Sequence, residues 1–245
     1  MLGEWKAEVV LPSRRVIVLC VSLGALALGW FPWRHFSSRR QLTEAPVPTI
    51  TKQPIAFANH TFDPAAPPAG MPPLVPGENA ECDSEFLSNA SVRGEPQQTD
   101  ATHATITVTQ VNMTLQLNIN VWVPTGVTQH VIDHEEGHRQ ISEYYYQTAD
   151  KLAERIAAKY MGRQFEITGP DLGAEFSKML QQLATDIADE YNKELNPGPA
   201  QLLYDAITDH SRNEVVVKDA VAHALKNTAI ESTRPPTNTE TDHAI

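Results

Sequence analysis

The sequence predicts an α+β domain in which a small antiparallel sheet is followed by three or four helices. Apolar residues alternate with threonine from Ala104 to Thr109, and the alternation resumes from Leu115 to Val123. Such a pattern is typical of strands with one buried face, and we expect these two strands to form a hairpin. Further along the chain, apolar residues recur at helical spacing. Strands followed by helices are the order of an α+β fold.

Each expected helix has residues that mark its ends. Thr128 is placed to cap a first helix, which Gly162 terminates. Asp171 is placed to cap a second helix, and the segment Asn196 to Pro199 breaks it. A third helix begins at that break, because proline is favoured in the first turn of a helix.

Changes in composition divide the chain into five parts. Residues 1–15 form a short N-terminal segment, and the uncharged apolar run of residues 16–33 has the length of a transmembrane signal anchor or a signal peptide. Residues 34–78 are rich in proline, which predicts an extended linker. We expect the folded domain at residues 79–228, a size that suits one core, and a disordered tail at residues 229–245.

Composition excludes two classes of site. The formal net charge is −11, so the chain lacks the excess of lysine and arginine with which nucleic-acid binders neutralise phosphates. Cysteine occurs at Cys20 and Cys82 alone, and Cys20 lies in the apolar run. The domain therefore has neither a disulfide framework nor a cysteine-based zinc site, and any metal must be held by histidine and carboxylate groups.

The motif His134-Glu135-Glu136-Gly137-His138 lies in the first expected helix. Histidines at this spacing lie on one side of a helix about one turn apart, where they can share one ion. Zinc suits imidazole ligands, and it lowers the pKa of a bound water from about 15.7 to about 7. Glu135 is placed to take and return the proton of that water as general base. The pattern predicts a zinc-dependent hydrolase, and two ordinary core histidines are the alternative.

Two histidines leave a third protein ligand to be found. His210 follows Leu203 and Ile207 at helical spacing, so we expect it to face inward and to complete the zinc site. Glu190 on the second helix is the alternative third ligand. A fourth protein ligand, such as Glu214, would make the site structural, because a catalytic zinc keeps one position open for water.

Two further residue sets have catalytic interpretations. The Tyr204 hydroxyl could donate a hydrogen bond to a developing oxyanion, or it could be satisfied in the core as most buried tyrosines are. The expected strand from Thr114 to Val123 could bind an extended substrate by backbone pairing.

Three segments of the chain resemble a family of bacterial predicted secreted zinc-dependent proteases, grouped as domain of unknown function 922. They are Trp122-Val123-Pro124, the motif from His134 to His138, and the segment from Tyr204 to His210. The last is similar to a Tyr-Asp-x-x-Thr-x-His element of the family, although this chain has Ser211 where glycine usually follows. The resemblance runs over roughly residues 77–225 and implies a zincin-like fold with a bound metal.

Together these observations predict a zinc metallopeptidase that hydrolyses peptide or protein substrates outside the cytoplasm. The N-terminal segment is expected to anchor it in the bacterial inner membrane with the domain in the periplasm, or to be cleaved from a secreted protein. A non-catalytic envelope protein with a structural or storage metal site is the alternative. Nucleic acid is not expected as a partner.

Overall fold

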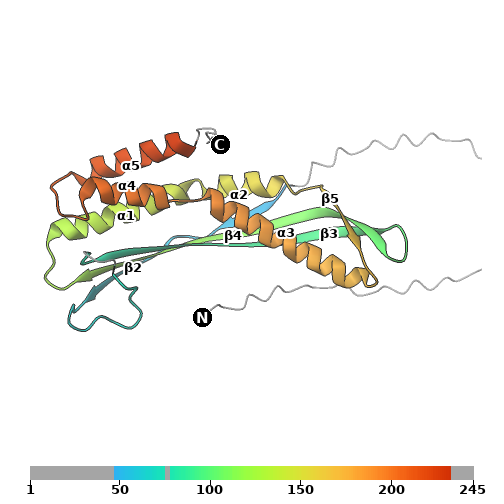
Figure 1. The fold of residues 1–245 in the computed structure, drawn as a ribbon, viewed down its shortest axis with the longest axis horizontal. Coiled ribbons are helices and arrows are strands. Elements are labelled where there is room, and N and C mark those ends of the chain that lie inside the picture. Colours follow the sequence, from blue (N-terminus) through green and yellow to red (C-terminus); the bar gives the residue numbers. More distant parts are fainter. Residues whose placement is uncertain (1–46, 75–77, 233–245) are drawn as a thin grey trace, which may run out of the picture. The chain divides into compact units, whose positions relative to one another are not determined.

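A 22-residue strand, β4 (His103–Pro124), runs through the middle of the sheet in this computed structural model (Figure 1). One edge of β4 pairs along most of its length with antiparallel β3 (Glu81–Gln98). The other edge pairs in turn with antiparallel β5 (Gln164–Thr168), parallel β1 (Thr49–Lys52) and parallel β2 (Ala56–Phe62). The fold is therefore mixed α+β, with a five-stranded sheet of parallel and antiparallel pairs.

The structure describes residues 47–74 and 78–232. The expected N-terminal segment at residues 1–15, the apolar run at residues 16–33, residues 34–46 of the expected linker and residues 233–245 of the expected tail lie outside that part of the chain. Among the described residues, no helix combines the length and the hydrophobicity needed to cross a membrane.

The predicted hairpin within residues 104–123 is wrong, because both expected strands belong to β4. Buried positions alternate up to Val108 and resume at Val111, one residue out of step. The shift coincides with a β-bulge, where Gly94 of β3 pairs with Val108 while Arg93 pairs with Gln110. A bulge inserts one unpaired residue without ending the strand, so the change of phase does not mark a turn.

Because β4 is paired on both sides, the proposed docking of substrate on residues 114–123 is also wrong. β3 occupies one edge of that stretch, and β1 and β2 occupy most of the other. Few backbone groups remain to bind an added strand.

The predicted linker at residues 34–78 is wrong for the segment from Thr49 to Phe62. This segment forms β1 and β2, both paired with β4, and Phe62 is buried. Its prolines do not interrupt the pairing, since Pro54 lies between the two strands and Pro64 follows the second. Proline lacks the N–H that a ladder needs, so it is tolerated at strand ends.

Five helices complete the described part of the chain. The first expected helix is in fact two, with a break at Thr148. Asp171 caps the third helix as predicted, since its carboxylate accepts a hydrogen bond of 3.0 Å from the backbone N–H of Ala174. The last helix extends the folded part to Ser232, beyond the expected boundary at residue 228. The helices are α1 (Gln129–Gln147), α2 (Ala149–Ala158), α3 (Leu172–Glu194), α4 (Gly198–Thr208) and α5 (Val217–Ser232).

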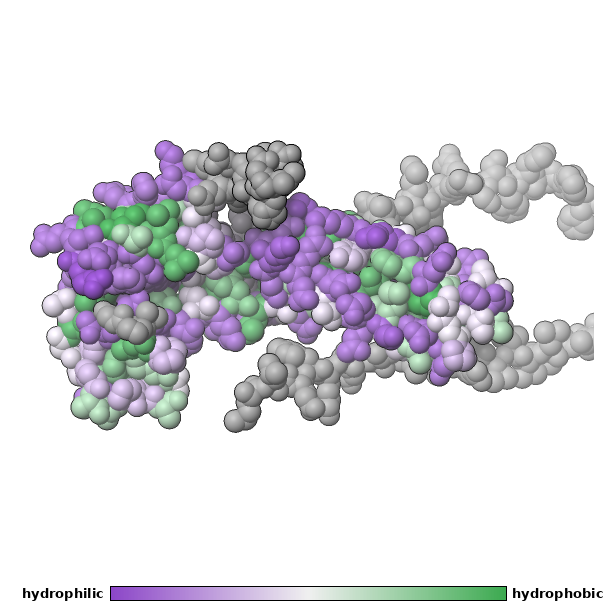
Figure 2. Space-filling model, viewed as in Figure 1, coloured by the Kyte–Doolittle hydropathy of each residue, from purple (hydrophilic) through white to green (hydrophobic). Residues whose placement is uncertain are grey.

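The main core lies between the sheet and the helices α1, α2 and α3, which pack on one face of the sheet (Figure 1). The alternate β4 residues from Val111 to Val121 are buried in it, whereas the residues between them are mostly polar and partly exposed. Hydrophilic side chains predominate along the outer side of α3 (Figure 2). A second cluster joins α1 to α4 and α5, and this packing brings α4 against the motif helix.

Candidate metal centre

His134 and His138 lie on one side of α1 with their reactive nitrogens facing each other. The two Nε2 atoms are 3.2 Å apart. His134 is buried, with 4% of its surface exposed, and the rings meet edge to face. The pair is thus arranged so that both imidazoles can bind one ion.

Asp205 on α4 completes a group of three donor atoms. Its Oδ1 lies 2.9 Å from His138 Nε2 and 3.4 Å from His134 Nε2. Asp205 Oδ1 and His134 Nδ1 are buried without a hydrogen-bond partner. Ligands about 2.0–2.1 Å from a tetrahedral zinc lie roughly 3.3 Å from one another. The spacing of the three atoms therefore fits a shared metal ion.

His210 is not on the helix that was expected to carry it. α4 ends at Thr208, and the three residues that follow, Asp209 to Ser211, all have positive φ angles between 49° and 64°. His210 Nδ1 lies 3.0 Å from Glu78 Oε1 and 3.8 Å from Asp205 Oδ1, in a second group of possible metal ligands. His210 therefore lies next to Asp205 in the second group. It is not part of the first group, which Asp205 forms with the two histidines of α1.

Glu135, the neighbour of His134 in the motif, is buried, with 5% of its surface exposed. Burial raises its pKa to about 8, and the nearby carboxylates of Glu81, Glu78 and Asp205 add to the rise while His138 opposes it. A buried acid with a pKa near the working pH is suited to general acid–base chemistry.

The charges of the three clustered residues depend on one another. Burial lowers the pKa of His134. Burial also opposes the charge on His138, but the close contact with Asp205 and the charge of Glu135 outweigh it and raise the pKa of His138. Burial likewise disfavours the Asp205 carboxylate, yet the two histidines hold its pKa below the usual range. Asp205 is therefore ionised at neutral pH.

Gln201, one turn before Asp205 on α4, fixes the orientation of His138. Its amide nitrogen donates to the His138 carbonyl (3.1 Å) and to Ser142 Oγ (3.0 Å). Its Oε1 must then be the acceptor in the 2.6 Å contact with His138 Nδ1. The Nδ1 atom of His138 consequently carries the hydrogen, and the Nε2 lone pair is directed at the group.

Tyr204 packs against the motif helix and its hydroxyl is engaged there. The hydroxyl donates a 3.1 Å hydrogen bond to the His134 carbonyl, and the ring stacks on His134. A Cβ atom at Gly137 would lie 2.2 Å from the Tyr204 hydroxyl, so glycine in the motif leaves room for the ring. These contacts match the buried, satisfied tyrosine that was weighed against an oxyanion donor.

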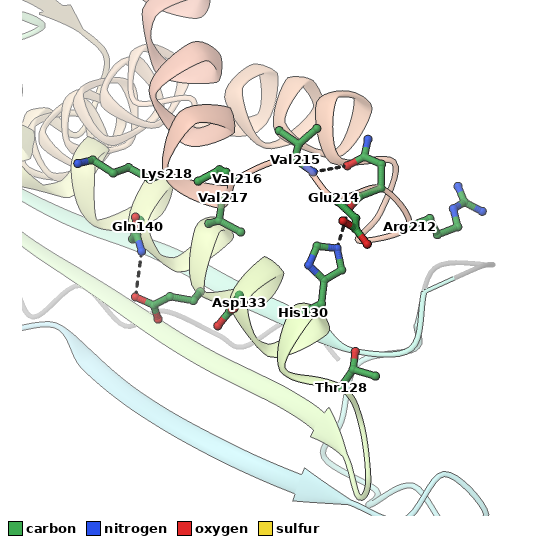
Figure 3. Close-up of a pocket in the computed structure, with 12 residues that line it drawn as sticks. Thr128, His130, Asp133, Gln140, Arg212, Glu214, Val215, Val216, Val217 and Lys218 are labelled. Carbon is green, nitrogen blue, oxygen red and sulfur yellow. Dashed lines mark hydrogen bonds between the residues drawn. The ribbon is translucent and has the colours of Figure 1, made fainter.

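Two acidic residues considered from the sequence lie away from both groups. Glu190 forms hydrogen bonds with Lys159 and Tyr160. Glu214 lines an open pocket of about 790 Å³. Figure 3 shows that residues of α1, including His130, form one side of this pocket and residues 212–218 the other. No residue of the first metal-ligand group lines it.

Sequence reasoning missed Asp205 and Gln201. A signal was present, because Gln201, Tyr204, Asp205 and Thr208 follow the i, i+3, i+4, i+7 pattern of one helix face. The more apolar stripe of Leu203 and Ile207 was taken as the inward one, whereas both are only partly buried.

The chain matches no family model, no curated protein and no solved structure. The family resemblance therefore stays a prediction, and the site itself is the basis for a functional conclusion.

Proposed function

We propose that this protein is a zinc-dependent peptidase of zincin-like type, in which His134, His138 and Asp205 hold the metal and Glu135 is the general base. The observation that carries the proposal is the convergence of three donor atoms, spaced 2.9–3.4 Å apart, beside a buried carboxyl group. Two histidines and one carboxylate are a donor set used by catalytic zinc sites.

Asp205 takes the role of third ligand that the sequence suggested for His210, with Glu190 as the alternative. The reason is proximity, since Asp205 Oδ1 contacts both histidine nitrogens. Glu190 is engaged with Lys159 on another part of the surface. Three protein ligands leave a position for water, which favours catalysis over a closed structural site.

The residues of the chain have separate tasks in this mechanism. His134, His138 and Asp205 would hold the zinc, which when bound would lower the pKa of a coordinated water and polarise the carbonyl under attack. Glu135 accepts the proton of that water and returns it to the leaving amine. Gln201 holds His138 in the tautomer whose Nε2 is free to bind metal. The apolar run at residues 16–33 supports a location outside the cytoplasm, either anchored to the membrane or secreted.

A comparison of two neighbouring glutamates tests the proposal. Glu135→Gln removes the base while leaving the proposed ligands, so turnover of a mixed peptide library should fall by roughly two to four orders of magnitude with zinc retained. Glu136→Gln is the matched control, because Glu136 faces Arg139 and Gln140 on α1. It should retain parental turnover.

Cleavage by the Glu135→Gln variant at the parental rate would contradict the mechanism. If the zinc-loaded parent cleaves no peptide in the library, the structural or storage role becomes the better explanation of the site.

A further inference from the structure

Glu78 and His210 meet beside the proposed zinc site. Their nearest donor atoms, Glu78 Oε1 and His210 Nδ1, are 3.0 Å apart. Together with Asp205 they form a group whose donor atoms all lie within 4.8 Å of one another. Glu78 precedes β3, Asp205 is on α4, and His210 is in the left-handed segment after α4. Separate parts of the chain thus converge on this point.

The close contacts in this group do not have the geometry of hydrogen bonds. His210 Nδ1 is buried without a hydrogen-bond partner, although Glu78 Oε1 is within reach. Asp205 Oδ1 is also without one, although His138 Nε2 is 2.9 Å away. Buried polar atoms in native proteins nearly always have partners. Atoms that approach without sharing a hydrogen are arranged as ligands are around a cation.

Four acidic side chains gather at this place. The carboxyl groups of Glu78, Glu81, Glu135 and Asp205 are close enough for their charges to interact. In the described part of the chain, the ion pairs formed by Glu78 and Asp205 are with histidine, and none joins any of the four to lysine or arginine. Carboxylates that have no lysine or arginine partner are suited to binding a cation.

We infer that Glu78, Asp205 and His210 form a second divalent-cation site, with Asp205 bridging it to the zinc site. Mixed imidazole and carboxylate donors suit Zn²⁺ or Mn²⁺. The inference rests on the proposed function, because Asp205 belongs to both sites. In paired metal sites, the two ions together stabilise the attacking and the leaving group.

Metal stoichiometry of the purified full-length protein tests the second site. After titration with Zn²⁺, and separately with Mn²⁺, the parent should hold two ions per chain. His210→Ala and Glu78→Gln should each hold one, bound as tightly as the tighter ion of the parent. His130→Ala is the matched control, because His130 contacts the Asn213 carbonyl and lies in neither group. It should hold two ions.

Manganese provides a readout that does not depend on activity. Two Mn²⁺ ions on one bridging carboxylate are magnetically coupled, so the electron paramagnetic resonance spectrum should change to that of an isolated ion in His210→Ala. Glu78→Gln should give the same change and serves if His210→Ala does not fold.

Three outcomes overturn the second site in different ways. If the parent and His210→Ala each bind one ion, there is no second site, and the proposed function is unaffected. If the parent binds one ion and His210→Ala binds none, there is again no second site, and His210 is a ligand of the single zinc. An absence of ions from the parent removes the proposed function as well.

Discussion

His138 is held from both sides of its ring. Asp205 contacts Nε2, and Gln201 accepts the hydrogen of Nδ1 at 2.6 Å. A group that hydrogen-bonds the second ring nitrogen of a metal-binding histidine sets the tautomer and the direction of the ring. Loss of such a group commonly weakens metal affinity roughly 10- to 100-fold. In the proposed site, Gln201 therefore acts on the metal through His138, without touching it.

Gln201→Leu should weaken zinc binding roughly 10- to 100-fold, as measured by competition with a chelator of known affinity. Gln201→Glu should recover much of the loss, because its carboxylate still accepts from Nδ1. The control is Gln140→Leu, since Gln140 bonds to Glu136 on α1 and not to the site. Equal zinc affinity in the parent and Gln201→Leu would show that Gln201 has no positioning role.

The spacing of residues in one helix could be read from the sequence, but contacts between helices could not. His134, Glu135 and His138 owe their relative positions to α1 alone, and helical geometry fixes them. Asp205 reaches them only because α4 packs on α1 by a polar stripe. Periodicity marks an apolar stripe as inward, so a polar inward face at a site is misjudged.

At the scale of elements, the contact between α1 and α4 depends on the absence of a side chain at Gly137. Tyr204 lies over this residue, and its hydroxyl binds the carbonyl of His134 one turn earlier. Glycine costs about 1 kcal/mol relative to alanine in a helix interior. The close approach of the tyrosine explains why glycine occurs there nonetheless.

Gly137→Ala should destabilise the protein by about 1–3 kcal/mol, because overpacking outweighs the gain in helix propensity. The added Cβ would lie 2.2 Å from the Tyr204 hydroxyl, which must move and displace α4 with its Asp205. Chemical denaturation measures the change, and zinc affinity should fall with it. At Gly70 a Cβ would have no neighbour within 4 Å, so Gly70→Ala should stay within about 0.5 kcal/mol of the parent. Unchanged stability in Gly137→Ala would show that α4 is free to shift.

The strands show where local pattern stops being informative. The alternation in β4 was recognised on both sides of Thr109, but a bulge and a turn can both interrupt an alternating pattern. What distinguishes them is the partner strand, since β3 continues past the bulge with Gly94 in close contact with Ile106. β3 itself carries many partly exposed polar residues, so it lacked a clear strand signal.

At the scale of the whole described unit, the sheet includes β1 and β2, which lie in a proline-rich segment whose composition is typical of a linker. The Tyr146 hydroxyl of α1 lies 2.8 Å from the Gln53 carbonyl and 3.0 Å from the Leu115 carbonyl, and its one hydrogen is shared between them. It thus ties that segment to the motif helix and to β4. The proline-rich composition did not predict these strands. Their pairing depends on contacts with β4, about 60 residues later, which composition does not show.

A chain that begins at residue 79, the boundary expected from the sequence, should therefore fail to fold, whereas one that begins at residue 47 should fold. Removing β1 and β2 exposes an edge of β4 and the surface that Phe62 covers, and it leaves the Tyr146 hydroxyl with one partner fewer. Thermal unfolding should be cooperative for residues 47–245 and absent for residues 79–245. If both chains unfold cooperatively at similar temperatures, β1 and β2 are dispensable, and the sheet is stabilised by the β3–β4 pair and the helices alone.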